Sequence, residues 1–118
     1  MTLEELRRET AIPIVIAEET GIITYVNAAF EQVFGWRRAE IVGQPVVVLV
    51  PPSLRDAHQL GFSRLLVTGV PTLVNRPLRL QALTKSGHAI EVEQTLVSEH
   101  RGGQWCFGAM ICPVGPTT

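Results

Sequence analysis

The sequence predicts an α+β domain in which one five-stranded antiparallel sheet packs its concave face against a group of short helices. Two short strand-like segments, residues 13–18 and 22–27, come first and are followed by helical segments. Three longer strand-like segments then follow at residues 73–84, 88–97 and 104–113, with turns at 85–87 and 99–103 between them. A length of 118 residues suits one such domain.

Composition excludes several classes of function. Hydrophobic residues make up 46% and the net charge is −1 with no basic cluster, which argues against direct nucleic-acid binding. No apolar run reaches the roughly 18 residues that span a bilayer, and the N-terminus has no signal-peptide core, so we expect a cytoplasmic protein without membrane contact.

Cys106 and Cys112 would lie about 20 Å apart on one strand. We therefore expect buried free thiols rather than a disulfide or a structural zinc site.

The chain divides into three parts. Residues 1–9 form a short helix that begins with a capping box, with Thr2 as the N-cap and Glu5 three residues later. Residues 10–113 form the domain, and residues 114–118 are a C-terminal tail or the start of a linker.

The helical segments follow the first two strands. Asn27 is the expected N-cap of a helix over residues 28–34, which ends at Gly35. A helical turn is expected at 37–42, and an apolar connector at 44–52 leads to the longest predicted helix.

The long helix, residues 52–69, has one histidine on its apolar stripe. His58 shares that stripe with apolar neighbours and with a glycine one turn later: Leu54, Gly61, Phe62 and Leu65. Gly61 removes side-chain bulk and would let a flat ring approach the helix. His58 is then an iron ligand, a contact for another ligand, or a core histidine that hydrogen-bonds a carbonyl or a nearby acid such as Asp56.

One amide stands out on the core face of the strand at 88–97. Gln94 shares that face with Ile90, Val92 and Leu96, so it is predicted to be the lone polar group there. It would either line a ligand pocket or bond a buried main-chain group. On the last strand, Ala109 is small where a cavity would need room, and it shares a face with Trp105, Phe107 and Ile111.

Four segments carry a family resemblance: GIITYVNAAFEQVFGW, RRAEIVGQP, KSGHAIEVEQTL and WCFGAMICPV. In this order they resemble a PAS domain over about residues 10 to 113. The resemblance implies a PAS fold and a non-catalytic sensory module of a larger bacterial-type signalling protein: a histidine kinase, a cyclic-dinucleotide enzyme or a transcription regulator. The output domain would be another part of the same polypeptide. The sequence contains neither a Gly-rich phosphate loop nor a GxSxG motif that would suggest an enzyme.

Within PAS domains, the central helix is similar to the haem-binding, FixL-type oxygen sensors. The R-x-x-H stretch that ends at His58, followed by Arg64 and a Thr-Gly helix end, implies b-type haem with His58 as its iron ligand. The oxygen-responsive arginine of these sensors falls on Leu78, and Arg79 would point to the other face of the strand. The candidate ligand-binding residues are His58, Gly61, Phe62, Leu65, Leu78, Gln94, Leu96 and Ala109.

Two functions of different classes remain. The first is a sensor of a small ligand or cofactor, with haem as the named candidate. The alternative is a ligand-free PAS interaction module that forms a homodimer through the sheet or the N-terminal helix. Flavin photochemistry through a cysteine adduct is excluded, because residues 28–70 contain no cysteine.

Overall fold

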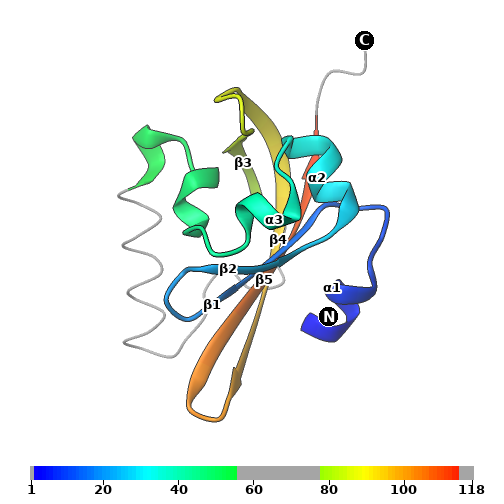
Figure 1. Cartoon of the computed structure of the whole chain (residues 1–118), viewed down its shortest axis with the longest axis vertical. Coiled ribbons are helices and arrows are strands. Elements are labelled where there is room, and N and C mark those ends of the chain that lie inside the picture. The colour runs from blue at the N-terminus through cyan, green and yellow to red at the C-terminus, as the bar shows by residue number, and fades with distance from the viewer. Residues whose placement is uncertain (1, 56–77, 115–118) are drawn as a thin grey trace.

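The computed structural model describes residues 2–55 and 78–114, and its sheet has five antiparallel strands in the order β2-β1-β5-β4-β3 (Figure 1). This confirms the predicted α+β architecture. The elements in chain order are α1 (Leu3–Arg8), β1 (Ile14–Glu18), β2 (Ile23–Val26), α2 (Ala28–Phe34), α3 (Arg38–Ile41), the 3-10 helices η1 (Val46–Leu49) and η2 (Pro52–Leu54), β3 (Leu78–Leu83), β4 (Ala89–Arg101) and β5 (Gln104–Pro113).

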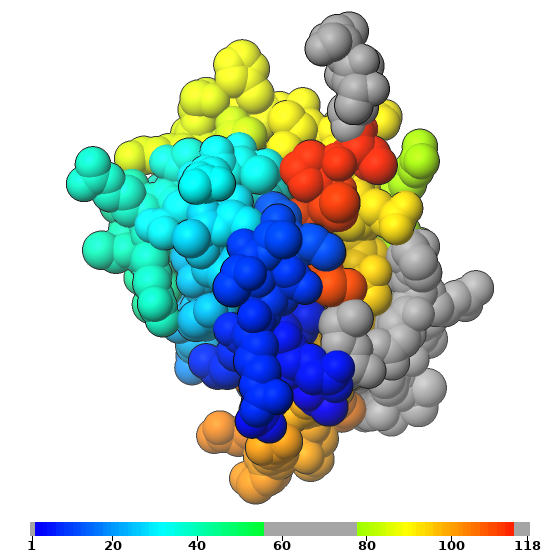
Figure 2. Space-filling view, turned by 90° about the vertical axis from the view of Figure 1, so that its right-hand side faces the viewer, coloured from blue at the N-terminus to red at the C-terminus, as the bar shows by residue number. Residues whose placement is uncertain are grey.

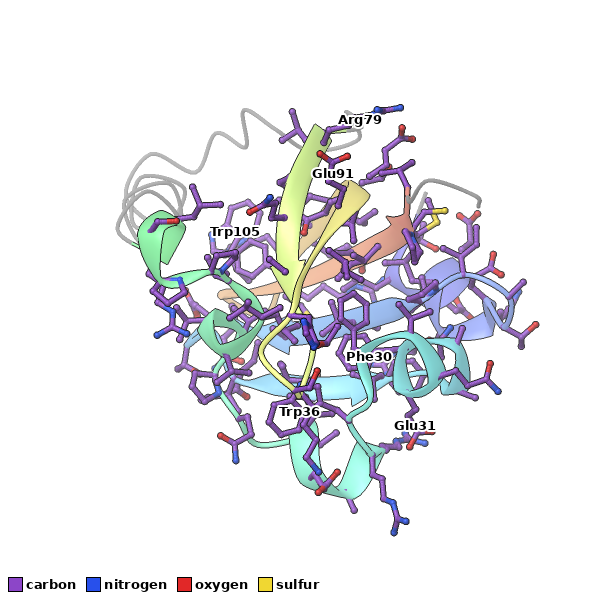
Figure 3. All side chains as sticks on the ribbon, turned by 90° about the horizontal axis from the view of Figure 1, so that it is seen from above. Phe30, Glu31, Trp36, Arg79, Glu91 and Trp105 are labelled. Carbon is purple, nitrogen blue, oxygen red and sulfur yellow. The ribbon has the colours of Figure 1, made fainter. Side chains whose placement is uncertain are left out.

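The sheet has an apolar layer on each face. On the face that we call inner, α2, α3 and η1 contribute Phe30, Phe34, Ile41 and Leu49 to one core cluster. Strand residues such as Val15, Val92, Ala109 and Ile111 complete that cluster. Figure 3 shows Phe30 directed from α2 toward the sheet. The short helices therefore cover the inner face, as the sequence predicts.

The N-terminal helix covers the outer face. Its capping box is confirmed, since Thr2 and Glu5 exchange the expected hydrogen bonds. Leu3 and Leu6 are buried against the outer-face residues of β1 and β4. A Cβ atom on Gly108 would lie 2.5 Å from a methyl carbon of each leucine, so the bare backbone at this position allows the close approach of α1. Figure 2 shows α1 in dark blue across this face.

The side chain of Asn27 bonds four backbone groups. Its Oδ1 atom accepts hydrogen bonds from the N–H groups of Ile14 (2.9 Å) and Phe30 (3.0 Å). Its Nδ2 atom donates to the carbonyl oxygens of Glu9 (2.9 Å) and Ile12 (2.8 Å). The predicted N-cap of α2 is confirmed, and the same buried amide also fixes the chain between α1 and β1.

The helix end at Gly35 is confirmed as well, with φ at 79°. Of the long helix predicted at 52–69, the structure places Pro52–Leu54 in η2, and everything from residue 56 lies outside the described residues. The predicted connector at 44–52 contains η1. The sequence did not predict this helix, because its short apolar run has no helical periodicity.

The last hairpin is longer than the sequence suggested. A turn was expected over residues 99–103, but β4 continues to Arg101 and pairs there with Gln104. Gly102 and Gly103 alone form the turn, with φ of 58° and 80°. A two-residue turn of this kind requires positive φ at both positions, which glycine adopts without strain, so the strands can pair up to it.

The cysteine prediction is half right. Cys106 is partly buried beneath α1, and burial raises the pKa of its thiol. Cys112 is exposed, so its predicted burial is wrong. It lies on the outer face near the end of β5, opposite the exposed Glu93.

No helix among residues 2–55 and 78–114 is long and apolar enough to cross a bilayer.

Candidate functional site

The predicted ligand-binding residues fall into two groups. His58, Gly61, Phe62 and Leu65 lie outside the described residues. The other four lie on β3, β4 and β5 on the inner face, and the strand register makes them neighbours: Leu78, Gln94, Leu96 and Ala109.

Two cross-strand rows define this part of the inner face. In the first, Gln94 lies between Leu78 of β3 and Ile111 of β5. In the second, Leu96 pairs with Ala109, which in turn pairs with Val15 of β1. Side chains in such rows are in contact range, so the sheet itself brings these positions together. Ala109 is buried within the inner core cluster, and Leu96 packs against that cluster.

Gln94 is the polar centre of the first row. Its side chain is partly buried between two apolar neighbours, Leu78 and Ile111. Among residues 2–55 and 78–114, no side-chain hydrogen bond of this amide is found. An amide has two donors and an acceptor, and those of Gln94 are accessible enough to bond water or a ligand. A ligand lying on this row could supply the partner.

The longer β4 adds polar residues that the sequence analysis missed. Ser98 and His100 continue the alternation of Gln94 and Leu96 on the inner face, so Gln94 is not the lone polar group there. His100 pairs with Trp105, and the two rings lie 4.9 Å apart between centroids. Trp105 and Phe107 follow along β5 with nearly parallel rings, 6.1 Å apart. The sequence carries no periodic signal for this extension, because residues 98–101 are all polar; the pairing of β4 with β5 reveals it.

The outer face of β3 and β4 is charged. Arg79 is exposed and pairs across the strands with Glu93, so it points away from Leu78 as predicted. Figure 3 shows Arg79 and Glu91 on the side away from α2 and α3. Within the described part of the chain, no group of three or more His, Cys, Asp or Glu side chains is placed to hold a metal ion.

A second polar group lies at the end of α2. Trp36 packs against the inner core, and its buried Nε1 atom has no hydrogen-bond partner among the described residues. The Lys85 Nζ atom lies 5.7 Å from the centre of the Trp36 ring and 2.6 Å from a carboxylate oxygen of Glu40. The Lys85 ammonium and the Arg37 N–H lower the pKa of Glu40. These contacts join the β3–β4 turn to α3.

The fold agrees with what comparisons to known proteins show. A family model described as PAS fold matches residues 3–111. An uncharacterized protein of Azorhizobium caulinodans is 35% identical over 100 residues, which are 83% of this chain and 14% of that protein. Sensor protein FixL of Bradyrhizobium diazoefficiens is 25% identical over 97 residues, which are 82% of this chain and 19% of FixL. The chain thus spans less than a fifth of the length of either relative.

The fold has a close counterpart among solved structures. The PAS domain of a Colwellia psychrerythraea protein superposes with a TM-score of 0.74 at 18% identity, covering 95% of this chain and 96% of that domain. The family-model match extends from the first turn of α1 to the inner-face residue Ile111 near the end of β5. The chain belongs to the PAS family.

Proposed function

We propose that this PAS domain is the sensory module of a larger signalling protein and binds a small ligand against the inner face of its sheet. The relative named sensor protein FixL, of which this chain matches 19%, supports the larger context. The observation that carries the ligand site is Gln94, an amide without a hydrogen-bond partner among the described residues, set in an apolar row. In this proposal the domain acts by binding its ligand and carries out no catalysis.

The residues around Gln94 indicate the chemistry of the ligand. Leu78, Leu96 and Ile111 offer apolar contact, and the amide offers donors and an acceptor to one polar group. A flat, largely apolar molecule with one polar edge suits this combination. Haem fits that description, and His58 would be its iron ligand. When bound, haem would supply a metal centre that takes up a diatomic gas.

A signal could leave the site along β4. Gln94 faces the ligand row, and five residues later Glu99 accepts a hydrogen bond of 2.8 Å from the Leu3 N–H at the start of α1. A ligand that favours one arrangement of β4 would thereby change the fraction of molecules in which α1 is docked on the sheet. We also propose that the output domain lies in the same polypeptide and that the domain forms a homodimer. Leu3 and Leu6 face their own sheet, so an α1 interface would use the other side of that helix or displace it.

Titration of the purified protein with hemin tests the ligand site. We expect one hemin per chain with a sharp Soret band, loss of that band in His58→Ala, and a shifted band in Gln94→Leu. Gln81→Leu is the matched control, because Gln81 is an exposed glutamine on the other face of β3. If the wild type takes up no hemin, haem is excluded. If native mass spectrometry also finds no co-purified small molecule, the ligand-free interaction module replaces the sensor.

A further inference from the structure

A second hollow lies away from the inner-face row, where α1, β2, α2 and α3 meet. Its volume is about 250 Å³. Side chains of both charge signs and one aromatic ring surround it. The residues that line it are Arg7, Glu9, Thr10, Tyr25, Val26, Asn27, Ala28, Glu31 and Arg38.

Two guanidinium groups meet at one ring in this hollow. The Cζ atoms of Arg7 and Arg38 lie 5.3 Å and 4.9 Å from the centre of the Tyr25 ring. The Tyr25 hydroxyl donates a hydrogen bond of 3.2 Å to the Arg7 carbonyl, which fixes the ring beneath the end of α1. Within residues 2–55 and 78–114, neither guanidinium forms an ion pair with a carboxylate.

The two carboxylates of the hollow are bonded to backbone instead. One oxygen of Glu9 accepts from the N–H groups of the next three residues, at 3.1, 2.9 and 3.3 Å. One oxygen of Glu31 accepts from the Arg38 N–H at 2.8 Å. Figure 3 shows Glu31 on the side of α2 next to α3. Both carboxylates therefore have backbone N–H partners, and neither takes up the side-chain donors of Arg7 or Arg38.

We propose that this hollow binds an oxyanion, a phosphate or carboxylate group held between Arg7 and Arg38. Guanidinium groups offer several N–H donors in one plane, and charge-assisted bonds to oxyanions are about twice as strong as neutral ones. The ring of Tyr25 limits the positions of both groups, which lowers the entropy cost of binding. The competing explanation is that both arginines only stack on Tyr25.

Such an anion would connect two parts of the domain that otherwise share few contacts. Arg7 lies in the last turn of α1, and Arg38 begins α3. A ligand bonded to both would hold α1 against the edge strand β2. The hollow is separate from Gln94, so this inference stands whether or not the inner face binds a ligand.

Thermal unfolding of the purified chain with increasing inorganic phosphate tests the proposal, with ionic strength kept constant by sodium chloride. We expect a saturable rise in Tm, because a ligand that binds only the folded state stabilises it by mass action. The apparent Kd should weaken at least tenfold in Arg7→Gln and in Arg38→Gln. Arg8→Gln is the matched control, since Arg8 lies on the same helix but pairs with Glu4 outside the hollow.

The outcomes separate the explanations. Equal phosphate responses in all four proteins, or no response in the wild type, would overturn the proposal. A parallel titration with acetate decides between the two sources of the oxyanion: a response to both means any carboxylate or phosphate, and a response to phosphate alone means a phosphate group. Shifts of the Arg7 and Arg38 side-chain N–H signals in NMR spectra, without shifts of Arg8, would support the site independently of stability.

Discussion

Replacing Asn27 separates its role as a helix cap from its role in joining backbone segments. Serine is as good an N-cap as asparagine, so Asn27→Ser would be nearly neutral if capping α2 were the whole role. In the structure, the same side chain also bonds the Ile14 N–H and the carbonyl oxygens of Glu9 and Ile12. Serine is too short to reach these three groups. We therefore expect Asn27→Ser to destabilise the domain well beyond the loss of a cap.

The magnitude follows from the burial of the three groups. The Ile14 N–H is buried, and leaving it unpaired costs about 1–3 kcal/mol. The two carbonyls are partly buried and regain some hydration, so each loses a net bond worth about 0.5–1.5 kcal/mol. Asn27→Ser should cost roughly 2–6 kcal/mol, and Asn27→Ala about 1 kcal/mol more because the cap is lost too.

Urea unfolding followed by circular dichroism measures both variants against the wild type. The serine variant keeps the measurement possible even where the alanine variant does not fold. A serine variant within about 0.5 kcal/mol of the wild type would refute the reasoning, because Asn27 would then act as a cap alone. Amide exchange at Ile14 gives a second readout, since that N–H should lose protection in both variants.

Two further predictions concern α1 and the β3–β4 turn. Gly108→Ala should destabilise the domain by about 1–3 kcal/mol and speed tryptic cleavage within α1, because its Cβ would overlap buried leucine methyl groups; an unchanged cleavage rate would contradict the described docking of α1. Glu40→Gln should lower Tm at pH 7, where the Lys85 contact that lowers the pKa of Glu40 stabilises the fold. That stabilisation is present above the ordinary glutamate pKa of about 4.3 and is lost as pH falls through the lowered value, so the Tm difference should shrink as the solution is acidified below the ordinary pKa. Glu91→Gln, at an exposed carboxylate on the outer face, is the matched control for removal of a surface charge.

Local sequence signals predicted the elements that depend on neighbouring residues. The capping box at Thr2, the bounds of α2 and its end at Gly35 are all confirmed. Each rests on hydrogen bonds or backbone angles within a few residues of one another, so the chemistry that determines them can be read locally. Alternation likewise placed Gln94 and Leu96 on the core face of one strand and Ala109 with Ile111 on one face of the next, whereas the family resemblance pointed to Leu78.

Errors arose where a local signal was read too narrowly. The turn predicted at 99–103 followed a run of polar residues, and only the pairing of β4 with β5 shows that the strand continues to Arg101. The expectation of buried thiols treated Cys106 and Cys112 alike, because strand spacing does not show how far along the outer face α1 extends. Only the position of α1 decides that Cys106 is partly buried and Cys112 exposed.

By itself, the sequence determined the fold class, the family resemblance and the inner-face location of the row around Gln94. These follow from periodicity and motifs, which are properties of order along the chain. Only the tertiary structure showed that α1 packs over Gly108 and that Asn27 joins segments up to 18 residues apart. It alone brought Arg7 and Arg38 to one tyrosine ring. Contacts between distant residues depend on how helices dock on a sheet, and no spacing in the sequence records that docking.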